Sequence, residues 1–221
     1  MDRLGIDRAL VCPFKPLSYD LEQANKDLAK AIHKHSDRFS GAARIDPWQP
    51  GADQSLSRAL EMLGLRALFL NPWEEHFRAD LDRLDPLMET ARSHHVPVLI
   101  AAGYPWVSEP LQVKKLADRW PAVPVIMSNG GQINISGLGQ ADAFLALKQS
   151  ANLFADTAGV YRQDFIEETI GALGEGRILF GSGAPYFEQE YELMRIQHAK
   201  LNSASCRALQ SGNALKLLRF L

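Results

Sequence analysis

The 221-residue sequence has little cysteine, no long apolar run and no cluster of one charge, and each absence argues against a class of protein. Its two cysteines, Cys12 and Cys206, match neither a C-x-x-C pair nor a zinc spacing, so we expect a reducing, cytoplasmic setting. No apolar run approaches the roughly 18 residues of a membrane span, and the opening Met-Asp-Arg does not resemble a signal peptide. Lys and Arg are scattered and the formal net charge is −2, which predicts a small-molecule partner rather than nucleic acid or a membrane.

The apolar residues that are present form short and long patterns in alternation. They make up 46% of the chain, and no linker or low-complexity segment divides it, so we predict one domain over residues 1–221. Seven β-rich runs are predicted strands: RALVCPF (8–14), FSGAARI (39–45), RALFLN (66–71), VPVLIAA (96–102), VPVIMSN (123–129), NLFADTA (152–158) and RILFGS (177–182). Five segments with apolar residues at i, i+3, i+4 spacing are predicted helices: 21–35, 79–95, 110–120, 141–150 and 164–174.

Near-continuous apolar strands joined by helices predict a parallel sheet covered on both faces, either doubly wound or closed into a barrel. The repeat of about 28 residues is close to a TIM-barrel unit. We therefore predict an α/β fold of the TIM (β/α)8 type that lacks its first strand and ends in a helical C-terminal tail. The opening MDRLGID reads as the end of a helix, so we expect the natural reading frame to extend upstream by about 30 residues. The unpaired edges of an open barrel also predict a homo-oligomer.

Polar residues follow most of the predicted strands. In chain order the residues at the strand ends are Lys15, Asp46, Asn71, Ala101 with Ala102, Ser128 with Asn129, Asp156 with Thr157, and Ser182 with Gly183. Because the active sites of TIM barrels lie at the carboxyl ends of the strands, this ring contains the candidate site residues. Alternatively, each polar residue caps the helix that follows it. Cys12 has no histidine near it in the sequence, so we interpret it as a small apolar core residue rather than a nucleophile.

Three loops after predicted strands, PWEEHF, GYPW and VYRQDF, are rich in aromatic and charged residues. They offer Trp73, Glu74, Glu75, His76, Tyr104, Trp106, Tyr161 and Arg162. Aromatic side chains there could form a pocket for a cyclic or sugar-like substrate, and packing between loops is the alternative. His76 is the histidine that we retain as a candidate. His33 and His35 end a predicted helix and point about 200° apart, whereas His94 and His95 precede their strand and lie at the opposite end of the barrel.

Several motifs, in their order and spacing, resemble the strand ends of amidohydrolase family 2. They are GID-x-ALV, RFSGAARIDP, VPVLIAAG, PVIMSNGG, LFADTAG, RILFGSGAP and GNALKLL, and they cover essentially the whole chain from strand two onward. The resemblance implies a distorted TIM barrel with hydrolase or decarboxylase chemistry and a divalent metal such as zinc. In that family the metal ligands or bases are an H-x-H at the end of strand one, a His after the strand here written VPVLIAA, a His in the segment here written SNGG, and an Asp at the position of Gly183.

This sequence departs from the family pattern at each of those positions. Strand one is absent, Ala101 and Asn129 replace the two later histidines, and Gly183 replaces the aspartate. Alanine and glycine side chains offer no lone pair to a metal. We therefore expect this chain to bind no metal at the barrel top and no other cofactor.

The resemblance implies an enzyme, although the usual metal ligands are not kept. We predict a hydrolase, or a carboxy-lyase, acting on a small carboxylate, lactone or cyclic substrate. Its predicted catalytic residues are Asp156 as the base, Asn129 to orient a carbonyl, and Lys15, which with Arg162 holds an anionic substrate. Further substrate-binding candidates are Asp46, Asn71, His76, Tyr104, Trp106, Tyr161 and Ser182.

The alternative is a catalytically inactive barrel that serves as a small-molecule binding or scaffold protein. An enzyme should place Asp156, Lys15 and Asn129 around one pocket. An inactive relic should instead have a filled or shallow top face.

Overall fold

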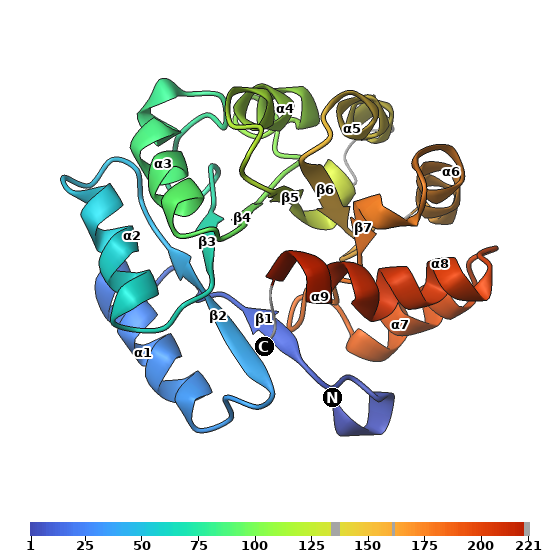
Figure 1. The fold of residues 1–221 in the computed structure, drawn as a ribbon, viewed down its shortest axis with the longest axis horizontal. Coiled ribbons are helices and arrows are strands. Elements are labelled where there is room, and N and C mark those ends of the chain that lie inside the picture. Colours follow the sequence, from blue (N-terminus) through green and yellow to red (C-terminus); the bar gives the residue numbers. More distant parts are fainter. Residues whose placement is uncertain (134–137, 161, 219–221) are drawn as a thin grey trace.

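The computed structural model describes residues 1–133, 138–160 and 162–218, and within them seven parallel strands form one sheet. The strands are β1 (Ala9–Val11), β2 (Phe39–Arg44), β3 (Ala67–Leu70), β4 (Val98–Ile100), β5 (Val125–Met127), β6 (Leu153–Asp156) and β7 (Ile178–Leu179). They pair in sequence order from β1 to β7, and the sheet curls as in a TIM barrel (Figure 1). Both the predicted strands and the predicted fold class are confirmed.

Helices connect successive strands and lie along the convex side of the curled sheet (Figure 1). They are α1 (Leu21–His33), α2 (Ala52–Glu61), α3 (Asp85–Ser93), α4 (Pro110–Arg119), α5 (Leu138–Gln149) and α6 (Gln163–Leu173). The C-terminal tail is helical as predicted and forms α7 (Gln189–Gln197), α8 (Ser203–Arg207) and α9 (Asn213–Leu218). In the described part of the chain, no helix is both long and apolar enough to cross a membrane.

The two faces of the sheet bury apolar side chains against different partners, because successive side chains of a strand point to opposite faces. Residues such as Leu68 and Val98 point outward and belong to the large core that the sheet shares with the surrounding helices. The inner, concave face carries a smaller cluster in which Ile126 and Leu179 pack with Leu218 of α9. The last helix therefore covers part of the barrel interior.

Strands β1 and β7 are the two edges of the sheet, and side-chain contacts span the seam between them. Phe14 and Tyr186, from the loops after these strands, meet edge to face with ring centroids 5.4 Å apart. Arg3, which precedes β1, forms a 2.7 Å ion pair with Glu190 of α7. In Figure 1, α9 lies between β1 and β7, and Leu10 of β1 belongs to the same apolar cluster as α9. Loops and the last helix thus bridge a seam that no strand pairing among the described residues closes.

Candidate functional site

Because all strands are parallel, their carboxyl ends open onto one rim of the sheet, where the sites of TIM barrels lie. Asp156, the last residue of β6, lies on this rim. Its Oδ1 accepts hydrogen bonds from the backbone amides of Asn129, at 2.9 Å, and Ala158, at 3.0 Å. Asn129 presents its amide in the left-handed conformation, with a φ of 56°. The predicted pair of Asp156 and Asn129 is thus brought into contact.

The environment of Asp156 shifts its acidity toward neutral pH. Desolvation raises the pKa of the carboxyl group from 3.8 to about 7. The two backbone hydrogen bonds oppose this shift, and the nearby charge of Glu192 adds a small increase. A carboxyl group with a pKa near the working pH can both give and take a proton.

The side chain of Asn129 is committed to its own loop. Its Nδ2 donates to the carbonyl of Ala158 at 3.0 Å, and its Oδ1 accepts from the Ser128 hydroxyl at 2.9 Å. These bonds fix the loop after β5 against the loop after β6 and so hold the amide that contacts Asp156. Asn129 therefore positions Asp156 through its backbone.

A second polar cluster joins the carboxyl ends of β2 and β3. Arg44, whose side chain is only 2% exposed, donates from Nη2 to Glu75 at 2.6 Å and also contacts Glu74. Asn71 donates to Glu74 at 2.9 Å. Desolvation raises the pKa of Glu75, and the charge of Arg44 opposes the rise. A pair buried this deeply is costly to break from one side, so it anchors the loop after β3 to β2.

The sequence interpretation missed Arg44, and it offered Glu75 only as a loop residue without this partner. A usable signal was present, because a charged residue at the end of the apolar run FSGAAR must find a partner if it is buried. Asn71 was predicted as a substrate ligand, whereas the structure gives it a hydrogen bond to Glu74 within this cluster.

Lys15 lies beside this cluster rather than beside Asp156. Its ammonium group donates to the backbone carbonyl of Glu74 and lies 4.2 Å from the ring centroid of Tyr19. Lys15, Asp46 and His76 line one cavity of about 710 Å³, so the structure brings three predicted residues together. Asp156 and Asn129 do not line this cavity. The expected arrangement of Asp156, Lys15 and Asn129 around one pocket is therefore not found at this cavity.

Cys12 lies between the two polar clusters. Desolvation raises the pKa of its thiol to about 11, while the charge of Arg44 lowers it and that of Asp156 raises it. The residue as a whole is nevertheless exposed, because Cys12 follows β1 at the open seam. The interpretation of Cys12 as a core residue was therefore wrong, since it assumed a barrel wall closed on both sides of β1.

The predicted aromatic residues fall into two groups. Trp73 and Tyr104 stack with ring centroids 5.4 Å apart and an interplanar angle of 13°. Desolvation raises the pKa of the Tyr104 hydroxyl, with smaller contributions from Glu74 and Tyr186. Trp106 is instead 78% exposed. The stacked pair is thus a rigid apolar surface on the rim, and Trp106 extends into solvent.

The remaining candidates have local partners or lie outside the described residues. Arg162 donates from Nε to Asp164 at 2.9 Å. The Ser182 hydroxyl accepts from the amide of Ala184 at 3.4 Å, a helix-cap-like contact within its own loop. Tyr161 lies outside the described residues.

The positions that hold metal in the resembled family do not fit a metal here. A Cβ atom at Gly183, where φ is +58°, would lie 2.7 Å from Cδ2 of Phe187, so the Phe187 ring occupies the space of any side chain there. Among the described residues, no group of three or more His, Cys, Asp or Glu side chains could hold an ion. The described residues therefore do not supply three or more such ligands for the divalent metal that the resemblance implies.

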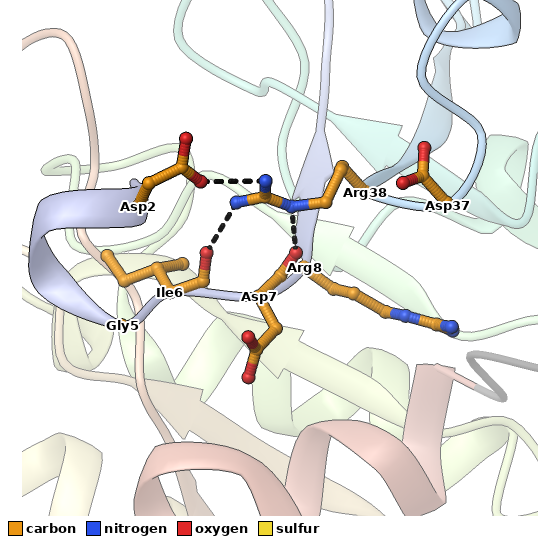
Figure 2. Close-up of a pocket in the computed structure, with 7 residues that line it drawn as sticks. All are labelled: Asp2, Gly5, Ile6, Asp7, Arg8, Asp37 and Arg38. Carbon is orange, nitrogen blue, oxygen red and sulfur yellow. Dashed lines mark hydrogen bonds and ion pairs between the residues drawn. The ribbon is translucent and has the colours of Figure 1, made fainter.

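A smaller cavity of about 330 Å³ lies next to the start of β1, at the amino ends of the strands. Figure 2 shows that Arg38 reaches into this region and ties down the N-terminal segment. Its guanidinium group donates to the carbonyls of Asp7 and Ile6, at 2.5 and 2.9 Å, and pairs with Asp2 at 2.7 Å. This end of a TIM barrel serves stability, and the contacts here match that role.

Comparison with known proteins relates the rim to a family. The sequence model of the amidohydrolase family matches residues 19–220. A gamma-resorcylate decarboxylase from Polaromonas sp. is 21% identical over 245 residues, which cover 89% of this chain and 75% of the relative. The 2,6-dihydroxybenzoate decarboxylase from Rhizobium shares the fold with a TM-score of 0.79 at 18% identity, covering 99% of this chain and 86% of that one.

A dihydroxybenzoic acid decarboxylase from Polaromonas sp., solved with bound manganese and the inhibitor 2-nitroresorcinol, has a TM-score of 0.75 at 18% identity. The structural match covers 99% of this chain and 83% of the decarboxylase chain. Likenesses at this level of identity establish the shared barrel fold.

Proposed function

Because this chain belongs to the amidohydrolase family, we propose that it is a carboxy-lyase that removes the carboxylate of a small aromatic acid, with Asp156 as proton donor. The reaction class follows the names of its relatives, which are decarboxylases of dihydroxybenzoates. Hydrolysis of a lactone or ester is the competing reaction within the same family. The alternative of an inactive barrel gains no support from these relatives.

The observation that carries the proposal is the environment of Asp156. Loss of carbon dioxide breaks the bond between the ring carbon and the carboxylate, and the electron pair stays on the ring carbon. That carbon must therefore gain a proton. A desolvated carboxyl group with a pKa of about 7 is protonated in about half of the molecules at neutral pH, so it can supply this proton and regain one from water.

The other rim residues support an aromatic acid as the substrate. The stacked Trp73 and Tyr104 offer a flat apolar surface for a ring. Lys15, Asp46 and His76 line the separate cavity, so they are not among the proposed substrate contacts. Asn129 keeps the loop amide on Asp156, and Ser182 and Arg162 remain proposed substrate contacts. Since the described residues do not fit a metal site, the proposed steps use only side chains of this chain.

The test is an assay of the full chain with 2,6-dihydroxybenzoate labelled with carbon-13 in its carboxyl group. We expect labelled carbon dioxide and resorcinol in equal amounts. Asp156→Asn should slow the reaction by about 100-fold or more, since a general acid contributes about 10²–10⁴. Asp27→Asn, on the exposed surface of α1, is the matched control and should leave the rate unchanged.

Two results would contradict the proposal. One is an Asp156→Asn variant that is as active as the wild type. The other is a panel in which dihydroxybenzoates are inert while lactones or esters are cleaved. The second outcome would assign the rim to hydrolysis instead.

A further inference from the structure

The cavity of about 710 Å³ extends from the rim down between α1 and α2, outside the barrel. Its volume falls within the range of about 300–1,000 Å³ that is typical of small-molecule sites. Its upper end is formed by the loops after β1, β2 and β3, which contribute Lys15, Asp46 and His76. Asp156 and Asn129 do not line it, so it is separate from the proposed reaction centre.

The walls of the cavity between α1 and α2 combine apolar residues with polar ones such as Asn25, Ser55 and Arg58. The apolar residues are Leu21 of α1, Ala52 and Ala59 of α2, and Met62 and Leu63, which follow α2. Met62 is 77% exposed, although it is a large apolar side chain. An exposed, flexible Met beside small residues provides an apolar surface that adapts to a ligand.

The acidic side chains that line the cavity all have partners among the described residues. Glu74 and Glu75 accept from Arg44, Glu22 accepts from Lys26, Asp20 accepts from the amide of Gln23, and Asp46 accepts from the amide of Trp48. Arg58 lies 3.9 Å from Glu22 and donates to Ser55. These negative charges and their cationic partners are thus largely satisfied without a ligand.

Two cationic or donor groups at the upper end remain available. Lys15 forms no ion pair with a described carboxylate, although its charge acts on Glu75 nearby, and its ammonium group uses a carbonyl and the Tyr19 ring as partners. The ring of His76 makes no hydrogen bond to the described residues, while its backbone carbonyl accepts from the Trp48 indole at 3.2 Å. Tyr19 and His76 also adopt left-handed conformations, with φ of 59° and 55°. Such strain persists where surrounding contacts enforce it, and it clusters at ligand sites.

We propose that this cavity is a second binding site, for a small organic anion with an apolar body. The carboxylate of the ligand lies at Lys15 and His76, and its apolar part lies between α1 and α2. The proposal goes beyond the carboxy-lyase activity, because it concerns different residues and a binding event rather than a reaction. It stands or fails independently of the role of Asp156.

The experiment uses the fluorescent anion 8-anilinonaphthalene-1-sulfonate with the full chain. We expect one saturable site per chain and displacement of the dye by benzoate, but not by benzyl alcohol or benzylamine at equal concentration. Lys15→Gln should weaken binding about tenfold, which corresponds to loss of one partly buried charge contact. Lys30→Gln, on the exposed side of α1 and outside the cavity, is the matched control and should bind as the wild type does.

A second variant tests the apolar end without touching Lys15. Ser55→Trp places a large side chain in the cavity from its half-buried rim and should abolish the saturable site while circular dichroism stays unchanged. Dye binding that neither Lys15→Gln nor Ser55→Trp weakens would overturn the proposal, because the dye would then bind elsewhere, such as on the open concave face. Displacement by benzylamine as effective as that by benzoate would also overturn it.

Discussion

Asp156→Asn should increase the free energy of unfolding at alkaline pH, because the native state penalises the charged form of this carboxyl group. Desolvation raises its pKa from 3.8 to about 7. A shift of about 3 pH units, at about 1.4 kcal/mol per unit, corresponds to about 4 kcal/mol as an order of magnitude. Asparagine removes the charge, and its Oδ1 can still accept from the amides of Asn129 and Ala158.

The sign of the pH dependence follows from the proton counts of the two states. Below the unfolded pKa the group is protonated in both states and has no effect on stability. Between that value and the native pKa of about 7, the native state binds more protons, so stability falls as the pH rises. Above the native pKa the full penalty is present.

Urea unfolding of the wild type and Asp156→Asn at about pH 5 and about pH 8 measures this penalty. The stability difference in favour of the variant should grow by about 2–3 kcal/mol between these two conditions. Asp27→Asn, which removes an exposed carboxylate, should follow the wild type at both. A difference between Asp156→Asn and the wild type that is the same at both pH values would refute the reasoning, since Asp156 would then titrate as in the unfolded chain.

Four further predictions concern the fold and its ligands. Arg44→Ala should lower the free energy of unfolding by about 3–5 kcal/mol, because it leaves the buried Glu75 carboxylate unpaired. Arg92→Ala removes an exposed pair and should cost below about 1 kcal/mol, and equal losses in urea unfolding would contradict this. Gly183→Ala should destabilise the fold by about 1–3 kcal/mol more than Gly174→Ala. Both glycines have a positive φ, but only at Gly183 would the added Cβ atom contact Phe187. Equal shifts in the melting temperature of the two variants would argue against that contact. Elemental analysis of protein purified without chelator should find well below one divalent metal ion per chain. The prediction would be contradicted by about one zinc or manganese ion per chain that is lost when a rim residue is replaced. Light scattering at micromolar concentration should show a dimer or larger assembly, because β1 and β7 are sheet edges, and a stable monomer would count against it.

The strands could be predicted from the sequence because buried parallel strands are short runs of apolar residues. The exact bounds of the strands could not be predicted. For example, the predicted run 123–129 contains a strand of only three residues, Val125–Met127, before the chain turns at Ser128. Helix α2 was not predicted. Its four buried residues, Ala52, Leu56, Ala59 and Leu60, have the i, i+4, i+7, i+8 spacing of an amphipathic helix, so the sequence did carry a signal for it.

The site could be predicted only in part. Residues at the strand ends were found because the topology requires the ends of parallel strands to share one rim. Contacts between residues distant in sequence, such as Arg44 with Glu75, depend on loop geometry that no spacing encodes. The sequence also could not predict that the candidates divide into two groups. Asp156 and Asn129 contact each other, whereas Lys15, Asp46 and His76 line the cavity. This division depends on the directions of the side chains.

The pH dependence of kcat/KM for decarboxylation of 2,6-dihydroxybenzoate tests the role of Asp156 most directly. If Asp156 is the proton donor, the rate of the wild type should fall by about tenfold for each pH unit above its pKa of about 7, because only the protonated acid is competent. Asp156→Asn should lack this inflection and retain only a small residual rate. A wild-type profile that is flat between about pH 6 and about pH 8, or the same inflection in Asp156→Asn, would contradict the assignment.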